Sequence, residues 1–328
     1  MRIAMMGTGT FAEPTFEALI ASFGGDVVGL VTQPDRDAGS KRGSTRQTGK
    51  GMANIAAACG IAVIQPASIN TPEGLELLRA LQPDLLVVAA YGQILSKDVL
   101  TVPTRGVINV HASLLPKYRG AAPVAYAILN GETTTGVTII KVTPGLDSGD
   151  MILQESLDIH PTDTTGSLEA RLADVGAKLA VEAVRLYKAG PATGTKQDPA
   201  GVTKAPKIKK ERGLIDWTQP GNVIRRHIRA MQPWPTAYTF LHRPGKEPMR
   251  VIINQAKGRP ASDREAASEA GEAVVNQDRA RLVIRCGGVS VIEATELQPA
   301  GKKKMTADEF LRGYPIVEGM RFGPEVLS

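Results

Sequence analysis

Two polar residues, Asn109 and His111, stand at the carboxyl end of the apolar segment Val107–Val110. Residues two apart on a strand project from the same face, so the two side chains are expected to lie together. A carboxamide and an imidazole can donate hydrogen bonds to the oxygen that becomes negative during acyl transfer. The pair is therefore suited to the transfer of an acyl group to an amine, although by itself it shows only two polar groups on one face of a strand.

Acyl transfer to an amine also needs a group that moves protons, because the amine must lose a proton and the leaving nitrogen must gain one. Asp147 is the best candidate, since it lies in the loop Gly145–Asp150, where flanking glycines allow a carboxylate to approach the imidazole. Each of these residues taken singly is more simply explained as a strand end, a core histidine or a turn residue. Their combination with the segment that follows the strand favours catalysis.

That segment contains Ser113, Leu114, Leu115 and Pro116, directly beyond the strand. It combines an apolar patch with proline, and a second proline and a glycine follow a few residues later. Such a composition suits a wall that grips a flat, partly apolar ligand.

The elements that must position these residues follow an alternating pattern in the first half of the chain. Short apolar runs, expected as buried strands, alternate with segments of helical periodicity. The strands are expected at Ile3–Met6, Val27–Thr32, Ile61–Ile64, Leu85–Ala89 and Val107–Val110, and the helices at Pro14–Ser22, Gly51–Cys59 and Pro72–Leu81. This pattern predicts an α/β fold with a doubly wound, mostly parallel sheet, whose ligands bind at the carboxyl ends of the strands.

The later part of the chain predicts a strand pair, a long helix and a second domain. The strand pair is expected at Thr135–Val142 and Met151–Ile159, and the helix at Thr165–Lys188. Short strand signals then follow a helix at Asn222–Met231, which favours a small β-barrel of the oligonucleotide-binding kind. The expected organisation is a catalytic domain at residues 1–189, a linker at 190–208 and a barrel domain at 209–328.

A glycine-rich turn near the amino terminus offers another interpretation. Gly7–Ala12 fits the Gly-x-Gly-x-x-Ala variant of the dinucleotide-binding motif, which would indicate an oxidoreductase. That motif also needs an acidic residue at the end of the second strand, where this chain has Leu30–Gln33. A tight turn between strand and helix is the simpler interpretation.

Composition and charge limit the classes of function. The formal net charge is +6, and the basic excess lies after Lys209, as a phosphate-rich partner would favour. Cys59 and Cys286 form no metal-ligand spacing and suit a reducing cytoplasm. No run approaches the roughly 18 apolar residues of a membrane-spanning helix, so we expect a cytoplasmic protein without membrane contact.

The stretch Gly106–Gly136 closely resembles the 10-formyltetrahydrofolate-dependent formyltransferases. The resemblance implies that Asn109, His111 and Asp147 carry catalysis and that Ser113–Pro116 help to bind the folate. It also implies that Tyr91–Leu95 form a loop beside the pteridine. The expected co-substrate is 10-formyltetrahydrofolate, and neither a metal nor NAD is implied.

Among members of that family, the resemblance is closest to those that formylate methionyl-initiator tRNA, and it extends over almost the whole chain. It is carried by Thr32–Arg36, Ile215–Trp217, Pro233–Pro235 and Leu297–Lys303. We expect tRNA contacts from basic residues of the early loop and of the second domain, and we expect a monomer. These residues are Arg36, Lys41, Arg42, Lys209 and Lys210.

The chain departs from the family pattern at two places. Gly9 stands where the family usually has proline, and Ser40 stands at the position that matches an important arginine of the basic loop. Either Lys41 and Arg42 take over that arginine's contact with tRNA, or the contact is weaker.

Two alternatives to a tRNA substrate remain open. A sugar-nucleotide formyltransferase shares the catalytic half and can carry a similar second domain. A non-catalytic nucleic-acid-binding protein would explain the basic charge, but it would leave the polar residues at the strand end without a purpose. Formyl transfer from labelled donor to each acceptor distinguishes these possibilities.

Overall fold

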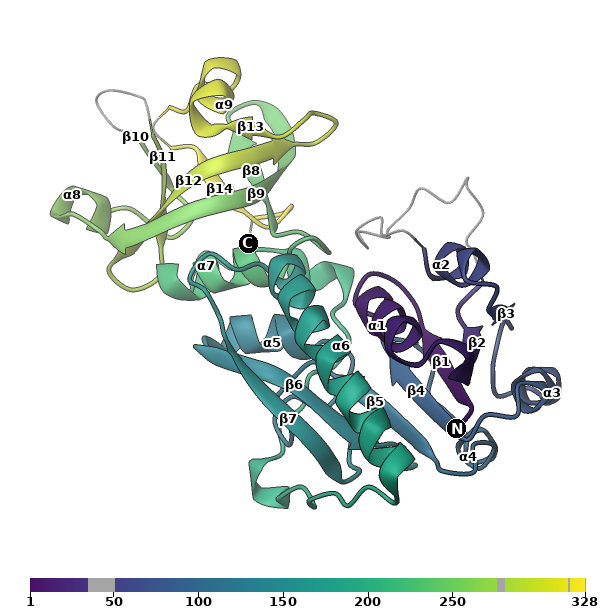
Figure 1. Cartoon of the computed structure of the whole chain (residues 1–328). Helices are drawn as coiled ribbons and strands as arrows, with labels where there is room; N and C mark the ends of the chain where they lie inside the picture. The colour runs from purple at the N-terminus through teal and green to yellow at the C-terminus, as the bar shows by residue number, and fades with distance from the viewer. Residues whose placement is uncertain (35–50, 276–280, 318, 328) are drawn as a thin grey trace. The chain divides into compact units, whose positions relative to one another are not determined.

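The structure is a computed structural model that describes residues 1–34, 51–275, 281–317 and 319–327. The chain forms two compact units, which are described separately (Figure 1). The first unit contains residues 1–127, 132–161 and 166–207. The second unit contains residues 128–131, 162–165 and 208–328.

The first unit is built on one mixed sheet in the order β3-β2-β1-β4-β5-β6-β7. Its strands are β1 (Ile3–Gly7), β2 (Val27–Val31), β3 (Ala62–Ile64), β4 (Leu85–Ala89), β5 (Val107–His111), β6 (Thr134–Lys141) and β7 (Met151–Asp158). The strands β1 to β5 run parallel, and β6 and β7 add to the β5 edge in antiparallel pairing. The predicted doubly wound sheet and its added strand pair are therefore confirmed.

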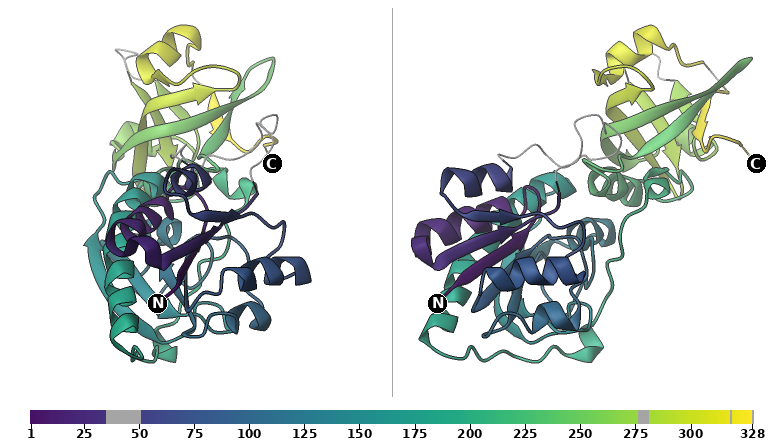
Figure 2. Two further views of the ribbon diagram at one scale, coloured as in Figure 1. Left: turned by 45° about the vertical axis from the view of Figure 1, so that its right-hand side comes forward. Right: turned by 90° about the vertical axis from the view of Figure 1, so that its right-hand side faces the viewer.

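Helices cover both faces of this sheet, as buried parallel strands require. They are α1 (Glu13–Phe23), α2 (Met52–Ala58), α3 (Pro72–Ala80), α4 (Lys97–Leu100), α5 (Pro123–Asn130) and α6 (Thr165–Ala189). On one face, Leu78 of α3 and Val99 of α4 pack against Ala4 and Met6 of β1. On the other face, α6 approaches so closely that a Cβ at its Gly176 would contact Val110 of β5. The layers can be followed in Figures 1 and 2.

The helices α4 and α5 were not predicted from the sequence. The helix α4 has a single turn, which is too short for a periodic pattern, and it is stabilised by the Ser96 hydroxyl, which accepts from the amide of Val99. The segment of α5 is apolar almost throughout, so it offers no polar face from which a helical period can be recognised.

The second unit contains an antiparallel sheet in the order β10-β11-β12-β9-β8-β14, with β13 paired to β12. Its strands are β8 (Tyr238–Arg243), β9 (Lys246–Pro260), β10 (Ala273–Val275), β11 (Leu282–Cys286), β12 (Ser290–Pro299), β13 (Met305–Thr306) and β14 (Arg321–Gly323). The two edges meet, since the amide of Ala273 donates to Met320 and the amide of Phe322 donates to Gly271. This closure confirms the predicted small β-barrel.

Helices accompany the barrel strands. They are α7 (Gly221–Ala230), α8 (Asp263–Ala266) and α9 (Ala307–Gly313). The sequence predicts only a short strand at Met249–Asn254. The strand β9 is much longer, because its pairing with β12 continues through two register shifts near Glu296. Such irregularities increase the local twist and allow long strands to curl into a barrel. None of the helices in the described ranges combines the length and the apolarity needed to span a membrane.

Residues 194–205 lie within the first unit, although the sequence predicts a linker there. Thr195 pairs with Met151 at the start of β7, and Lys204 pairs with Arg119. Backbone hydrogen bonds thus attach this segment to two separate parts of the first unit. It is called the strap below.

Candidate active site

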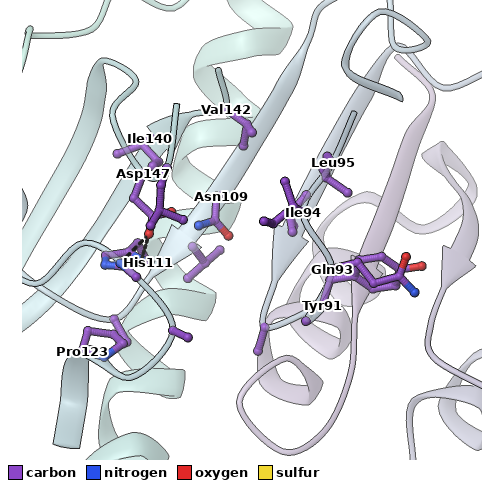
Figure 3. A pocket seen from close by; sticks show the side chains of 18 of the residues that line it. Tyr91, Gln93, Ile94, Leu95, Asn109, His111, Pro123, Ile140, Val142 and Asp147 are labelled. Carbon is purple, nitrogen blue, oxygen red and sulfur yellow. Dashed lines mark hydrogen bonds and ion pairs between the residues drawn. The ribbon is translucent and has the colours of Figure 1, made fainter. Parts of the chain in front are cut away.

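A pocket of about 570 Å³ lies in the first unit at the carboxyl ends of β1, β4 and β5 (Figure 3). Its walls come from Thr8–Phe11 after β1, Ala90–Leu95 after β4 and Asn109–Ala112 at the end of β5. The chain crosses from β3 at one edge back to β4 on the other side of β1, so the strand order reverses between β1 and β4. Doubly wound sheets bind ligands at this point, because the loops on either side diverge and leave a crevice.

Asn109 is the third of the five residues of β5, and its side chain faces the pocket (Figure 3). The residue is half-buried. Among the described residues its carboxamide has no hydrogen-bond partner, so both its donor and its acceptor atoms are available to a ligand. A half-desolvated amide of this kind is a stronger hydrogen-bond donor than one in open water.

His111 is almost fully buried beside Asn109, with 5% of its surface exposed. Its Nε2 lies 3.0 Å from the backbone carbonyl oxygen of Tyr118. Because a carbonyl oxygen only accepts, Nε2 must carry the proton in this arrangement. Nδ1 lies 3.7 Å from Oδ2 of Asp147. That distance is longer than a hydrogen bond, so Nδ1 lies near the carboxylate but is not hydrogen-bonded to it.

Asp147 is held against the imidazole by the loop between β6 and β7. Its Oδ2 accepts a hydrogen bond of 2.8 Å from the backbone amide of Gly120. Its φ of 45° lies in the left-handed region, which is unfavourable for a residue with a Cβ and must be maintained by surrounding contacts. The structure therefore brings together all three predicted catalytic residues, Asn109, His111 and Asp147, at one pocket (Figure 3).

The rim of the pocket is apolar. Ile94 and Leu146, on opposite loops, expose 81% and 63% of their surfaces and both line the cavity. Leu95 and Val142 continue the apolar lining (Figure 3). Large apolar side chains that remain exposed beside a concave site indicate a ligand with a flat apolar part.

The loop after β4 adds one buried polar atom. The hydroxyl of Tyr91 has no hydrogen-bond partner among the described residues, and burial raises the pKa of this phenol to about 12. The neighbouring Gln93 fixes the loop, because its side chain accepts from the amide of Ile69 and donates to the carbonyl of Ala67. These hydrogen bonds to Ile69 and Ala67 hold the loop in place, and its apolar tip faces the pocket.

Ser113, Leu114, Leu115 and Pro116 do not line this pocket. The Ser113 hydroxyl donates to the carbonyl of Lys117, and the amide of Leu115 donates to the hydroxyl of Thr138. These contacts build the turn that presents the Tyr118 carbonyl to His111. The pocket wall instead comes from later in the same stretch, through Gly120, Ala121 and Pro123. Direct contact of Ser113–Pro116 with a folate stays a prediction.

The glycine-rich turn forms part of the pocket wall. The amide of Ala12 donates to the carbonyl of Gly9, whose φ of 81° requires glycine-like freedom. At the end of β2, the Thr32 hydroxyl lies 3.2 Å from the Thr8 hydroxyl. A threonine pair thus occupies the place where a dinucleotide site would carry an acidic residue.

The residues predicted to contact tRNA fall in two places. Arg36, Lys41 and Arg42 lie outside the described residues. Lys209 and Lys210 belong to the second unit, at the start of the short helix η3 (Lys210–Gly213), and both are exposed. Their contact with a nucleic acid stays a prediction.

Two sequence families match successive parts of the chain. Residues 1–184 match the formyl transferase family, and residues 207–315 match the C-terminal domain of formyl transferases. The described pocket falls entirely within the first of these matches.

Solved structures share this fold at low sequence identity. The N-formyltransferase from Helicobacter canadensis, in complex with folinic acid and dTDP-3-aminofucose, is 19% identical and has a TM-score of 0.65. The comparison covers 90% of this chain and 98% of that one. HypX from Aquifex aeolicus, in complex with tetrahydrofolic acid, is 16% identical with a TM-score of 0.59 and covers 95% of this chain and 47% of that one.

Curated relatives are much more similar in sequence. The methionyl-tRNA formyltransferase of Moorella thermoacetica is 45% identical over 98% of this chain and 99% of the relative. The methionyl-tRNA formyltransferase of Bacillus subtilis is 41% identical over 97% of this chain and 96% of the relative. With both domain families matched and this similarity over nearly the full length, the chain belongs to the methionyl-tRNA formyltransferase family.

Proposed function

We propose that this enzyme transfers the formyl group of 10-formyltetrahydrofolate to the α-amine of methionyl-initiator tRNA and so forms N-formylmethionyl-tRNA. The observation that carries the proposal is that Asn109, His111 and Asp147 line the same pocket. The similarity to methionyl-tRNA formyltransferases over nearly the whole chain supports the choice of acceptor.

The pocket suits a folate as formyl donor. Its volume of about 570 Å³ lies within the range of sites for cofactor-sized ligands. A pteridine ring is flat, and the side chains of Ile94, Leu95 and Val142 offer it apolar contact. The polar end of the pocket, with Asn109 and His111, is then where the formyl group lies.

In the proposed reaction, the amine nitrogen bonds to the formyl carbon, and the carbonyl oxygen becomes negative. The carboxamide of Asn109 donates a hydrogen bond to this oxyanion. His111 stabilises the oxyanion from the adjacent position when Nδ1 also carries a proton, since Nε2 already donates to the Tyr118 carbonyl. One such donor contributes about 10²–10³-fold to the rate of acyl transfer.

Collapse of the intermediate breaks the bond between the formyl carbon and the N10 nitrogen of the folate. One proton leaves the amine and one proton reaches N10, so the folate departs as tetrahydrofolate. Asp147 orients the imidazole and relays these protons. The carboxylate is suited to this because Gly120 occupies only its Oδ2, and its side chain retains 15% exposure toward the pocket.

The second unit is proposed to bind the tRNA. It is a closed β-barrel that carries the basic excess of the chain, and such barrels bind oligonucleotides on a face of the sheet. A sugar-nucleotide acceptor is the alternative, since a solved structure of the same fold holds dTDP-3-aminofucose. Identity of 45% to a methionyl-tRNA formyltransferase, against 19% to that protein, favours tRNA.

A transfer assay tests the proposal. The enzyme is incubated with 10-formyltetrahydrofolate labelled in the formyl group and with methionyl-initiator tRNA or an aminosugar nucleotide. Label is expected in the aminoacyl-tRNA and not in the sugar. Label in the sugar alone would establish the alternative, and transfer to neither acceptor would refute formyl transfer to these amines.

Replacement of both Lys209 and Lys210 by Ala is expected to weaken tRNA binding and to leave binding of the folate unchanged. Each lost phosphate contact should reduce the slope of log affinity against log salt by about 0.7–0.9. Filter binding between low and physiological salt measures this slope. The exposed lysines Lys97 and Lys178 of the first unit provide a charge-matched control pair. Equal slopes for the two double variants would exclude Lys209 and Lys210 from the tRNA contact.

A further inference from the structure

The strap, residues 194–205, is hydrogen-bonded at the end of the loop that carries Asp147 and to the turn at Arg119. Thr195 and Met151 exchange two backbone hydrogen bonds of 2.8 Å at the end of the Asp147 loop. The amide of Arg119 donates to Thr203, and the carbonyl of Arg119 accepts from Ala205. The strap therefore joins the loop that bears Asp147 to the turn whose backbone contacts both His111 and Asp147.

Gln197 lies at the centre of this connection and is nine-tenths buried. Its Nε2 donates to the carbonyl of Asp147 at 2.7 Å and to the carbonyl of Gly149 at 2.8 Å. Its Oε1 accepts from Nε of Arg119 at 3.0 Å and from Nη2 at 2.7 Å. Because carbonyls only accept and a guanidinium only donates, the orientation of this amide is determined by its partners. All four of its hydrogen-bonding positions are used.

The Asp147 loop needs such support. Asp147 has a φ of 45°, which a residue with a Cβ adopts only when its surroundings hold it there. A hydrogen bond from Gln197 to the carbonyl of Asp147 holds the peptide that follows this strained residue. With that bond lost, relaxation of the backbone would carry the carboxylate away from the Gly120 amide and from His111.

We propose that Gln197, itself held by Arg119, is a positioning residue for Asp147, and that the strap is consequently part of the active site. The inference rests on the proposed role of Asp147 in formyl transfer. Gln197 contacts no reacting atom in this proposal. It acts by keeping the carboxylate within reach of the imidazole.

Gln197→Glu is the most informative variant. It replaces the amide nitrogen by oxygen and adds a negative charge beside Arg119, so the acceptor for Arg119 remains while both donors to the loop carbonyls are lost. We expect kcat to fall by about 10²-fold, as for a displacement of a catalytic group by about 1 Å. The KM values for 10-formyltetrahydrofolate and for methionyl-tRNA should change little. In NMR spectra, the imidazole resonances of His111 should shift.

Arg119 gives a second and milder variant pair. Arg119→Ala removes both donors to Gln197 and should lower kcat, whereas Arg119→Lys retains one donor and should recover part of the loss. This graded response is expected of a positioning contact and remains measurable if Gln197→Glu folds poorly.

Gln232→Glu is the matched control. In the second unit, Nε2 of Gln232 also donates to two backbone carbonyls, those of Ile228 at 2.9 Å and Asn254 at 2.6 Å. Two donated hydrogen bonds to backbone carbonyls are lost here, as in Gln197→Glu, but neither of them involves the Asp147 loop. This variant should melt at a similarly lowered temperature, while its kcat at saturating methionyl-tRNA and its His111 resonances stay as in the parent enzyme.

The outcomes separate the inference from the proposed function. The positioning role would be overturned by a wild-type kcat in Gln197→Glu or by an equal loss of kcat in Gln232→Glu. It would also be overturned if Gln197→Glu raised KM and left kcat unchanged. Failure of the parent enzyme to transfer formyl groups would instead refute the proposed function. Full activity of Asp147→Asn would remove the role of Asp147 on which the inference rests and would leave formyl transfer itself standing. A kcat loss in Gln197→Glu with an unchanged KM supports both.

Discussion

Asp147→Asn and His111→Ala are each expected to lower the single-turnover rate of formyl transfer by about 10²-fold or more. Asn at position 147 still accepts the hydrogen bond from the Gly120 amide, so the loop should keep its conformation. The substitution removes the negative charge beside the imidazole and the capacity to take up a proton. The loss should therefore appear in the chemical step and not in binding.

His111→Ala removes the imidazole and with it the hydrogen bond that His111 makes to the Tyr118 carbonyl. The cost in the free energy of unfolding should be about 1–3 kcal/mol, as for other buried polar groups that lose a hydrogen bond. The fold should persist.

Rapid-quench kinetics with labelled donor measures the transfer rate of both variants, and circular dichroism checks the fold. A parent-like rate in either variant would exclude that residue from catalysis. Unfolding of His111→Ala would leave Asp147→Asn as the deciding variant.

Gly149→Ala is expected to displace the Asp147 loop by a purely steric effect. A Cβ at this position would overlap the carbonyl oxygen of Lys141, which belongs to the backbone and cannot rotate away. We expect a loss of about 1–3 kcal/mol or more in the free energy of unfolding, as for other overpacked sites. We also expect a fall of about 10²-fold in kcat, because the loop must move to relieve the overlap.

Gly190→Ala is the control for this substitution. No heavy atom lies within 4 Å of a Cβ built at Gly190, and its backbone lies outside the left-handed region. The same methyl group should be tolerated there without loss of stability or activity. Chemical denaturation and steady-state kinetics measure both quantities. Equal behaviour of the two variants would show that the close approach at Gly149 is unimportant for the loop.

Much of the first unit follows from local sequence patterns. The strands β1, β2, β4 and β5 are buried on both faces, and a continuous apolar run is recognisable without knowledge of the partners. The helix α6 is long enough to display its amphipathic period. The second unit is harder to predict, because strands as short as β13 and β14 form through pairing with distant strands. Those partners determine the structure of such segments.

The residues of the site could likewise be predicted from the sequence. The sequence by itself predicted Asn109, His111 and Asp147 as the catalytic residues, from a shared strand face, a glycine-flanked loop and the resemblance to formyltransferases. Only the tertiary structure decided that the pocket wall comes from Gly120–Pro123 and not from Ser113–Pro116, and that Gln197 supports Asp147. Gln197 lies 50 residues from Asp147, in a segment whose composition resembles a linker. Local sequence patterns indicate the secondary-structure propensity of a segment and the burial of its side chains. A hydrogen bond between residues far apart in the sequence forms only once the chain has folded.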